Sequence, residues 1–335
     1  MKRDLYPALV RPFLFSLAPE TAHHLAVDSL EFASRHPLIL RRLERFQPEA
    51  APRSLFGLEF RHRIGLAAGF DKNGVALPAW EALGFAFVEI GTVTARAQPG
   101  NPKPRIFRYP AQQALINRLG FNNDGADVVA ERLARLRARG AWPTIPIGIN
   151  LGKSKATPLE QAADDYLYSF QKLQEFADYI VLNVSSPNTP DLRALQEIVA
   201  LSHLLGVIEK ANRNAPKPVL LKIAPDLATA DLDDLIRACE QHGIAGLIAT
   251  NTTLDHSSIA PAADQAGGLS GGPLREKATA FVRAIRSRTS LPIIGVGGIV
   301  SAADAREKFE AGASLVQVYT GYVYGGPRFL RTLAA

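Results

Sequence analysis

The chain has 335 residues, of which 47% are hydrophobic and 21% are charged, a composition typical of globular proteins and unlike that of disordered or fibrous ones. A chain of this length buries roughly 75% of its extended surface on folding, so its stability requires neither disulfides nor a structural metal. The 38 Lys and Arg outnumber the 32 Asp and Glu, which gives a net charge of +6, but basic and aromatic residues are not interleaved as in RNA-binding modules. We therefore expect no nucleic-acid partner.

The first 45 residues predict a pair of helices. Residues 5–18 are hydrophobic but are interrupted by prolines and charged residues, and no small-residue cleavage site follows them, which argues against a signal peptide. No apolar run reaches the about 18 residues that a membrane-spanning helix needs. A second segment, 19–36, begins with Pro19 and Glu20 at helix-opening positions.

This N-terminal segment also suggests a location. It contains seven Lys and Arg against five Asp and Glu, a net charge of +2. Apolar helix faces with a small positive charge suit a helix pair that lies on a membrane surface. The alternative is a hairpin that only packs against the main domain.

Beyond Pro52 the chain alternates short apolar runs with helix-length segments. The apolar runs fall at 64–69, 86–93, 145–150, 179–185, 219–224, 246–251, 292–298 and 314–321. The helix-length segments include 158–176, 193–212, 229–242, 273–289 and 301–311. The runs are apolar at successive positions, as strands buried on both faces are. Eight such alternations predict a (β/α)8 TIM barrel, with a doubly wound open sheet as the alternative.

Two segments depart from this alternation. LFGLEF and RHRI, at 55–64, resemble a short hairpin that could close the base of the barrel. The connection 94–122 contains four prolines and is too broken for a helix and too long for an ordinary loop. We expect it to be an ordered excursion that contributes to the active site.

The single cysteine, Cys239, lies in a segment with the pattern of an amphipathic helix. One thiol cannot form an internal disulfide, and this setting favours packing over redox or nucleophilic chemistry. The cysteine content therefore indicates a reducing compartment.

Polar residues gather at the carboxyl ends of the predicted strands, where a barrel builds its active site. They include Asp71, Lys72, Thr92, Asn150, Asn183, Ser185, Ser186, Asn188, Thr189, Lys222, Thr250, Asn251, Thr252, Tyr319 and Thr320. Lys222 and Asn183 lie inside apolar strands, where an unpaired polar group is costly. The strand of Lys222 supplies no carboxylate before Asp226, so a bound anionic partner is favoured over an internal salt bridge.

The last two strands end in Gly297, Gly298 and Gly321. Such glycines let backbone N–H groups approach a phosphate, and the loops after strands seven and eight are the usual phosphate site of this architecture. No His or carboxylate pair shares a strand end at ligand spacing, so we predict no metal site. The absence of GxGxxG after the first strand disfavours a nicotinamide dinucleotide. These features predict an enclosed phosphorylated cofactor, with asparagines around a small substrate.

Nine longer stretches carry a resemblance. They are LAAGFDKNG, EIGTVTARAQPGNPKPRIFR, INRLGFNNDG, LNVSSPNTPDLR, LKIAPD, ATNTT, GGLSG, GVGGI and YTG. Together they closely resemble the class 2 dihydroorotate dehydrogenases, which are membrane-associated and quinone-dependent. The resemblance runs from about residue 5 to the C-terminus. It implies a helical quinone-tunnel extension at 1–45 and an FMN-binding (β/α)8 catalytic barrel at 46–335.

The resemblance implies one FMN per chain, dihydroorotate as the substrate in pyrimidine biosynthesis, and ubiquinone or a similar quinone as the co-substrate. The implied FMN contacts are Ala68, Gly69, Phe70, Asp71, Lys72, Thr92, Asn150, Asn183, Lys222, Thr250, Gly271, Gly298, Tyr319 and Thr320. The implied substrate contacts are Lys72, Asn117, Arg118, Leu119, Gly120, Phe121, Asn183, Asn188, Asn251 and Thr252.

The chemistry implied by the resemblance is oxidation of the C5–C6 bond of dihydroorotate, with Ser186 as the base that removes the C5 proton. An unaided serine hydroxyl is a poor base, so Thr189 and an ordered water shielded by Phe121 are candidates for a proton relay. Soluble class 1 relatives carry a cysteine at this position, and this chain has none nearby. Lys222 would stabilise negative charge that develops on the flavin.

The implied quinone tunnel has His23 and Arg108 at its inner end. For His23 the alternative is a solvent-facing position, although His24 is the better candidate for the exposed residue. For Arg108 the alternative is an ion pair with an acid. We expect a monomer bound peripherally, through its N-terminal helices, to the cytoplasmic face of the cell membrane.

Two competing hypotheses remain at this point. One is a related FMN barrel that reduces another pyrimidine with nicotinamide electrons. The other is a non-catalytic module that binds membranes or nucleic acid, which rests only on the net charge and the amphipathic start of the chain.

Overall fold

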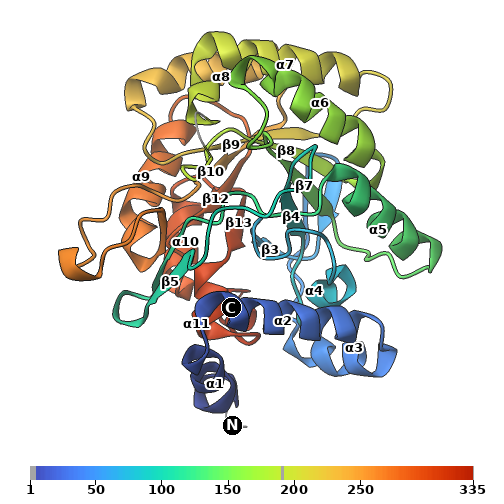
Figure 1. Cartoon of the computed structure of the whole chain (residues 1–335), viewed down its shortest axis with the longest axis vertical. Helices are drawn as coiled ribbons and strands as arrows, with labels where there is room; N and C mark the ends of the chain where they lie inside the picture. Colours follow the sequence, from blue (N-terminus) through green and yellow to red (C-terminus); the bar gives the residue numbers. More distant parts are fainter. Residues whose placement is uncertain (1–4, 190–191, 335) are drawn as a thin grey trace.

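The computed structural model describes residues 5–189 and 192–334, and its central feature is a closed barrel of parallel strands (Figure 1). The barrel strands are β3 (Ile64–Leu66), β4 (Val88–Val93), β7 (Ile147–Leu151), β8 (Tyr179–Asn183), β9 (Val219–Ile223), β10 (Gly246–Ala249), β12 (Ile293–Val296) and β13 (Leu315–Val318). They are neighbours in chain order, and β13 pairs with β3 to close the barrel. Each strand overlaps one predicted run, so the TIM-barrel prediction is confirmed and the open sheet is wrong.

Helices surround the barrel wall (Figure 1). They are α4 (Leu77–Leu83), α5 (Ala126–Ala138), α6 (Ala162–Leu173), α7 (Ile198–Asn212), α8 (Leu232–Gln241), α9 (Arg275–Arg286), α10 (Ala302–Glu310), α11 (Thr320–Gly325) and α12 (Phe329–Ala334). Short 3₁₀ turns accompany them at η3 (Pro110–Gln112), η4 (Leu159–Gln161), η5 (Gln174–Phe176), η6 (Leu192–Gln196), η7 (Thr229–Asp231), η8 (Pro261–Ala263) and η9 (Gly272–Leu274). All five predicted helix-length segments contain a helix.

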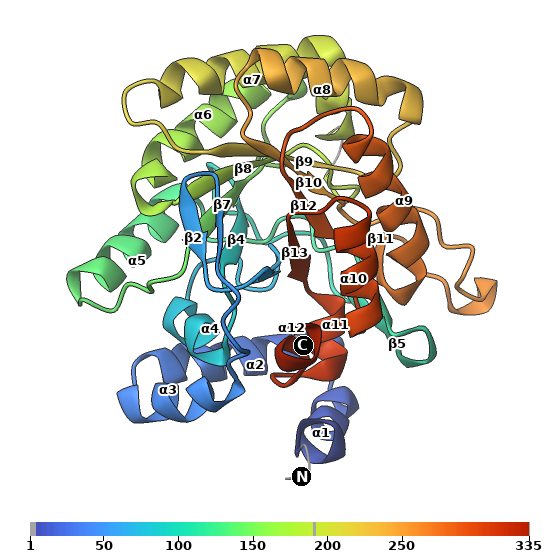
Figure 2. The ribbon, with the colours of Figure 1, turned by 180° about the vertical axis from the view of Figure 1, so that it is seen from behind.

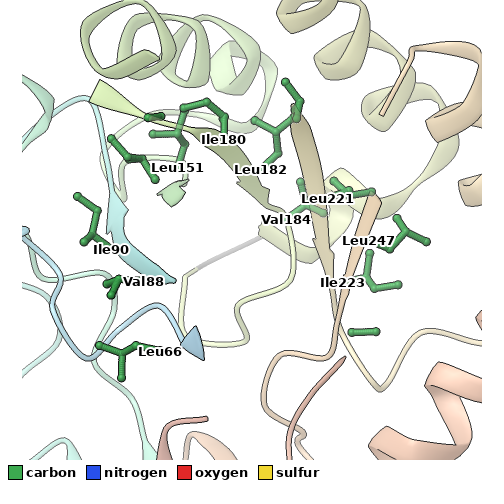
Figure 3. Packing of buried hydrophobic residues seen from close by; sticks show 14 of the residues in the cluster. Leu66, Val88, Ile90, Leu151, Ile180, Leu182, Val184, Leu221, Ile223 and Leu247 are labelled. Carbon is green, nitrogen blue, oxygen red and sulfur yellow. The ribbon is translucent and has the colours of Figure 1, made fainter. Parts of the chain in front are cut away.

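The barrel strands bury side chains on both faces. On β8, Ile180 and Leu182 belong to the core between strands and helices, whereas Val181 belongs to the core inside the barrel. Figure 3 shows the outer set, with Ile180, Leu182 and Leu221 on neighbouring strands of the wall. Because alternate residues point to two buried faces, the strands appear in the sequence as continuous apolar runs rather than as alternating patterns.

A β-hairpin closes the amino-terminal end of the barrel (Figure 2). It consists of β1 (Arg53–Leu55) and β2 (Leu58–Phe60), joined by a turn at Phe56 and Gly57 where both residues have positive φ. Phe56 lies against Gly246 at the start of β10, and Phe60 packs on the core inside the barrel. The predicted hairpin is therefore confirmed, but RHRI is not its second strand, because the chain turns already at Gly57.

The excursion 94–122 is ordered, as expected, but it contains strands that were not predicted. These are β5 (Ile106–Tyr109) and β6 (Ala114–Asn117), which pair antiparallel. A third unpredicted strand, β11 (Gly268–Gly271), lies outside the excursion, between β10 and α9, and pairs with β6. Flanking prolines obscure the pattern of β5 and β6, and two of the four residues of β11 are glycines. Its pairing is therefore visible only in the tertiary structure.

The N-terminal segment is helical up to residue 46. Its elements are η1 (Tyr6–Val10, a π-helix), α1 (Arg11–Ser16), α2 (Pro19–Ser34), α3 (Pro37–Leu43) and η2 (Glu44–Phe46). Large apolar side chains are exposed along it at Leu5, Leu9, Val10, Phe13, Leu25, Phe32 and Leu38. Within the described residues, no helix combines the length and the apolar character that crossing a membrane demands. Residues 1–4 of the predicted extension lie outside the described residues.

A buried ion pair fastens α2 to the excursion. Arg105 Nη2 lies 2.7 Å from Glu20 Oε1, and the two side chains are 6% and 11% exposed. Arg105 also donates hydrogen bonds to the carbonyls of Pro99 and Asn101. Burial alone would raise the pKa of Glu20, but the hydrogen bond and charge of Arg105 outweigh burial and lower it. The N-terminal helices are thus anchored to the same loop that reaches the barrel mouth.

This ion pair generates a stability prediction. Glu20→Ala leaves the Arg105 guanidinium buried without its counter-charge, and we expect the free energy of unfolding to fall by about 3 kcal/mol. The exposed pair of Glu31 and Arg35 provides a control, since Glu31→Ala should cost no more than about 1 kcal/mol. Urea unfolding at neutral pH measures both variants. Equal losses would contradict the role assigned to the buried pair.

The same pair predicts a pH dependence. Because the pKa of Glu20 is lower in the folded chain than in the unfolded one, its contribution is complete above the unfolded pKa and is lost as the pH falls through the folded pKa. Between neutral and acidic pH, the wild-type chain should therefore lose more unfolding free energy than Glu20→Ala. Parallel pH dependences of the two proteins would count against the ion pair.

Candidate functional site

A pocket opens at the carboxyl ends of the barrel strands and has an empty volume of about 1130 Å³, including its mouth. The strands of a parallel barrel all end on one rim, so residues far apart in the sequence meet there. Seven of the eight barrel strands contribute to its wall, either directly, as β9 does through Lys222, or through the segments that follow them, which include the excursion and β11. This convergence is what the sequence analysis predicted.

Most of the predicted site residues line this one pocket. The predicted cofactor contacts among them are Ala68, Gly69, Lys72, Thr92, Asn183, Lys222, Thr250, Gly271, Gly298, Tyr319 and Thr320. The predicted substrate contacts are Lys72, Asn117, Leu119, Gly120, Phe121, Asn183, Asn188, Asn251 and Thr252, and Ser186 is also part of the wall. The wall also includes Gly297 and Gly321, which the sequence predicted for the approach to a phosphate. Further residues of the wall were not predicted: Ala67, Ile106, Leu115, Ser270, Leu274, Val296, Ile299, Gln317 and Val318.

Asp71 does not line the pocket but supports the loop that does. Its carboxylate accepts hydrogen bonds from the backbone N–H groups of Val75 and Ala76, each at 2.9 Å, and from Trp80 Nε1 at 3.0 Å. All three donors lie at or near the start of α4, so Asp71 holds the end of β3 against this helix. Its carboxylate is directed away from the cavity.

Phe70 and Arg118 also lie outside the pocket lining. The Phe70 ring packs against Trp80 and Tyr319, with centroids 5.2 and 4.9 Å apart. The Arg118 guanidinium donates to backbone carbonyls of the excursion and of the loop before β11, and lies 4.7 Å above the Phe107 ring. The Arg118 side chain is therefore engaged within the protein, and only its backbone borders the residues that line the cavity.

A polar cluster occupies the barrel interior below the pocket, centred on the fully buried Glu89 of β4. Its Oε1 accepts from Asn150 Nδ2 at 2.7 Å and from Lys222 Nζ at 3.2 Å, and its Oε2 accepts from Gln317 Nε2 at 2.5 Å. The expectation that Lys222 lacks an internal carboxylate is therefore wrong. The partner comes from a strand 133 positions away, which only barrel closure brings opposite Lys222.

Sequence reasoning passed over Glu89 and Gln317 as site residues. The available signal was the one that singled out Lys222, namely a charged or amide side chain inside an otherwise apolar strand. Asn150 belongs to the same cluster, and it is buried behind the pocket rather than exposed in its lining.

A chain of hydrogen bonds continues from this cluster to the rim. Asn150 Oδ1 accepts from Thr92 Oγ1 at 2.6 Å and from Asn183 Nδ2 at 3.2 Å. Asn183 Oδ1 in turn accepts from Ser185 Oγ at 3.0 Å and from Asn251 Nδ2 at 3.3 Å. The side-chain amides of Asn150, Asn183 and Asn251 are thus linked in sequence by hydrogen bonds. Thr92, Asn183 and Asn251 also line the pocket.

Two basic side chains, Lys72 of the pocket wall and His23 of α2, influence each other electrostatically. Burial, assisted by the charge of Arg105, lowers the pKa of Lys72 to about 8. Burial also lowers the pKa of His23 well below 6.5, with Lys72 adding to the effect, and the His23 ring lies 5.3 Å from that of Phe70. The alternative that His23 faces solvent is therefore wrong, whereas His24 is exposed as expected.

Arg108 contacts α1 rather than an acid. Its guanidinium donates to the carbonyls of Leu14 and Leu17 and lies 4.6 Å above the Phe15 ring. A second cavity, between the N-terminal helices and β5, is lined by Arg108, Phe15 and Ile106, and Ile106 also lines the main pocket. Arg108 therefore lies where the two cavities approach each other.

Ser186 is buried and its Oγ accepts a hydrogen bond from the Asn188 N–H at 3.2 Å. Near it in sequence, Thr189 Oγ1 is buried and has no hydrogen-bond partner among residues 5–189 and 192–334. Phe121 lines the same pocket as Ser186. A buried hydroxyl without a partner is unusual, so Thr189 has a free hydrogen-bonding position for a water molecule, although it does not line the pocket itself.

Arg193, which was not predicted, holds the segment after Ser186 in place. Its Nε donates to the carbonyl of Ser185 at 3.2 Å, and its Nη1 lies 3.1 Å from Asp226 Oδ2. Asp226 also binds Lys277 Nζ at 2.6 Å. Asp226 therefore pairs with Arg193 of η6 and Lys277 of α9, whereas the carboxylate beside Lys222 is that of Glu89.

Two kinds of chemistry considered from the sequence, thiol chemistry and metal binding, concern groups outside the pocket. Cys239 is buried in α8, and burial raises the pKa of its thiol to about 12. Across the part of the chain that the structure describes, no three His, Cys, Asp or Glu side chains are grouped so that they could hold a metal ion.

Comparisons with known proteins agree on one family. Residues 51–334 match the family model described as dihydroorotate dehydrogenase. The chain is 54% identical over 337 residues to the dihydroorotate dehydrogenase (quinone) of Gloeobacter violaceus, covering 99% of this chain and 93% of that protein. It is 51% identical over 340 residues to the protein of the same name from Salinispora arenicola, covering 99% and 98%.

Solved structures give the same result. The crystal structure of DHODH from Eimeria tenella in complex with ferulenol matches with a TM-score of 0.84 and 37% sequence identity, covering 93% of this chain and 89% of that one. The ligand-free form of the Eimeria tenella protein matches with a TM-score of 0.83.

The pKa of Lys72 predicts its reactivity. With a pKa of about 8, about half of its amine is unprotonated at pH 8, whereas a lysine with the ordinary pKa of about 10.4 is almost fully protonated there. Reductive methylation of the ligand-free protein, followed residue by residue with mass spectrometry, should give Lys72 a midpoint near pH 8. A profile that coincides with that of the exposed lysines would contradict this assignment.

Proposed function

The chain belongs to the dihydroorotate dehydrogenase family, and from this premise we propose that it oxidises (S)-dihydroorotate to orotate with FMN in the barrel and a membrane quinone as the final electron acceptor. The reaction would serve de novo synthesis of UMP. The observation that carries the proposal is the single pocket that unites Lys72, Ser186 and Lys222. These residues supply a cation for an anionic substrate, a candidate base and a buried cation at the pocket floor.

The pocket lining fits FMN. Lys72 and Lys222 contribute positive charge, and Gly297 and Gly298 at the end of β12 suit the phosphate because glycine lets the backbone approach it closely. Gln317 also lines the cavity, and its Nε2 is held by Glu89 while its side chain interacts with the buried Tyr179 hydroxyl. We assign FMN to the predicted contacts that line the pocket, with Phe70, Asp71 and Asn150 supporting them from behind. When bound, FMN would supply a two-electron acceptor for the substrate.

Residues that line the substrate side of the pocket can each be given a proposed contact with dihydroorotate. Lys72 would bind the carboxylate of dihydroorotate, and the amides of Asn117, Asn188 and Asn251 would hold its ring polar atoms. Of the excursion residues, Leu119, Gly120, Phe121 and the backbone of Arg118 would complete the contact, together with Asn183 and Thr252. These assignments agree with the pocket lining for every residue except the Arg118 side chain.

Ser186 would remove the C5 proton of dihydroorotate. Its hydroxyl needs an onward acceptor, and the unpartnered Oγ1 of Thr189 supports a relay through a water molecule, with Phe121 limiting access of bulk water. Lys222 would stabilise the negative charge that accompanies electron transfer out of the substrate. Its pairing with Glu89 keeps the ammonium group at the pocket floor.

The extension, residues 1–45, would lead quinone to this pocket from a membrane. The exposed apolar side chains between Leu5 and Leu38 form a surface suited to lipid. Contacts of His23 with Phe70, and of Phe70 with Tyr319, connect α2 to the pocket wall. We propose His23 and Arg108 as quinone-tunnel residues, and a monomer bound peripherally to the cytoplasmic face of the cell membrane.

The overall reaction can be tested with the purified protein under anaerobic conditions. Dihydroorotate should bleach the flavin absorbance, and a quinone should restore it, whereas NAD⁺ and fumarate should not. Restoration by NAD⁺ or fumarate instead would favour the related nicotinamide-dependent or soluble barrels. A folded protein that copurifies with no flavin and binds none would refute the proposal.

Ser186→Ala tests the assignment of the base. The variant should retain FMN, because the proposed FMN contacts are unchanged, but its flavin should be reduced by dihydroorotate roughly 10²-fold more slowly or worse. Stopped-flow absorbance measures this rate, and reoxidation of the chemically reduced variant by quinone serves as the internal control. An unchanged reduction rate would exclude Ser186 as the base.

The double variant Leu9→Asp/Phe13→Asp tests the proposed membrane-facing surface. It keeps Glu20, so the buried ion pair with Arg105 stays intact. Binding to lipid vesicles and reoxidation by a long-chain quinone should both decrease, because the charged residues oppose burial in lipid. Flavin reduction by dihydroorotate should be unaffected. Val199→Asp, an exposed apolar position on α7, is the matched control. Unchanged vesicle binding in the double variant would place the membrane surface elsewhere.

A further inference from the structure

We infer that Glu89 is a positioning residue for the proposed reaction: its carboxylate fixes which atoms the pocket amides present, and it balances the charge of Lys222 beneath the cofactor. The inference rests on the proposed function. Glu89 itself does not line the pocket, so it acts through other residues.

The Glu89 carboxylate lies in largely apolar surroundings. Glu89 is fully buried, and the barrel interior around it is built mainly from apolar side chains, including Phe87, Val181 and Leu220. A carboxylate in such surroundings is stable only when charges or hydrogen-bond donors replace its hydration. Lys222, Asn150 and Gln317 provide these, each from a different strand. Glu89 therefore links β4 to β7, β9 and β13 at one level of the barrel.

Glu89 also sets the donor and acceptor directions of the hydrogen bonds that lead to the pocket. An ionised carboxylate can only accept hydrogen bonds, so Asn150 must turn its Nδ2 toward Glu89 and its Oδ1 away from it. This Oδ1 then faces Thr92 Oγ1 and Asn183 Nδ2, both of which must donate. Asn183 consequently presents its Oδ1 to the amide of Asn251. One acceptor at the bottom of the network thus determines the orientation of each amide up to the substrate wall.

Glu89 also compensates the positive charge of Lys222. Lys222 Nζ lies 3.2 Å from Glu89 Oε1 and also lines the pocket, so a bound flavin would experience a neutral pair rather than an isolated cation. Removing the negative charge of Glu89 would leave Lys222 uncompensated. Electrostatic interactions are strong in a buried, water-poor site, and an added positive charge favours the electron-rich, reduced form of the flavin.

Glu89→Gln tests both consequences, because it keeps the size of the side chain while removing the charge and introducing a donor. We expect the ratio of reduced to oxidised FMN at a fixed applied potential to rise about tenfold, which is about 30 mV for a two-electron couple. Orotate binding, measured by the change it causes in the flavin spectrum, should weaken by at least about tenfold, since the amides can reorient. Spectroelectrochemical titration measures the first effect without turnover.

Two further variants separate positioning from simple packing. Glu89→Asp retains the charge and should keep the flavin potential close to that of the wild type. Phe87→Leu opens space in the same barrel interior and should lower thermal stability without shifting the potential. An unchanged or more negative potential in a folded, FMN-bound Glu89→Gln protein would overturn the inference.

Should Glu89→Gln fail to fold or to bind FMN, thermal unfolding of the double variant Glu89→Gln/Lys222→Met decides the question. If Glu89 balances Lys222, removal of both charges should restore stability relative to Glu89→Gln alone. No recovery would overturn the inference. Its failure remains distinct from failure of the proposed function, because the latter is measured on the wild-type protein by flavin content and by reduction with dihydroorotate.

Discussion

A buried carboxylate inside a closed parallel barrel is the constraint on which this site depends. Glu89 has no access to water, so the barrel must supply its donors, and it does so from three other strands through Lys222, Asn150 and Gln317. Because these strands are themselves held in register by the barrel, the polar cluster and the barrel wall support each other. This polar cluster forms the floor of the pocket, and the hydrogen-bond network that leads to Asn183 begins at Glu89.

Around this floor, the loops are held by charges that do not enter the pocket. Asp71 fixes the loop after β3 to α4, and Arg193 joins the segment after Ser186 to Asp226. Arg105 connects the excursion to Glu20 on α2. Since these charged groups are paired with protein, they organise the loops, whereas Lys72 lines the cavity itself. Because the residues that hold the loops differ from those that line the pocket, several loops can converge without filling the cavity.

The N-terminal helices are consequently coupled to the site through residues that pack against its wall. The pair of Glu20 with Arg105 reaches the loop that also borders the pocket, and His23 lies over Phe70, which packs against Tyr319 of the pocket wall. The charges of Arg105 and Glu20 both act on Lys72. A substitution that alters a charge on α2 can therefore change the electrostatics at Lys72, the proposed site of the substrate carboxylate. The exposed apolar surface lies on the opposite side of this helix.

The sequence by itself determined the eight strands and the polar residues at their carboxyl ends, because burial on both faces and strand termination are local properties of the chain. The long motifs also named most of the residues that line the pocket. Only the tertiary structure decided which of them face it: Asp71 and Asn150 turn away, the Arg118 guanidinium binds backbone carbonyls, and Lys222 has Glu89 as its partner. These choices depend on barrel closure and on the pairing of β11 with β6, which join positions far apart in the chain and leave no local pattern in the sequence.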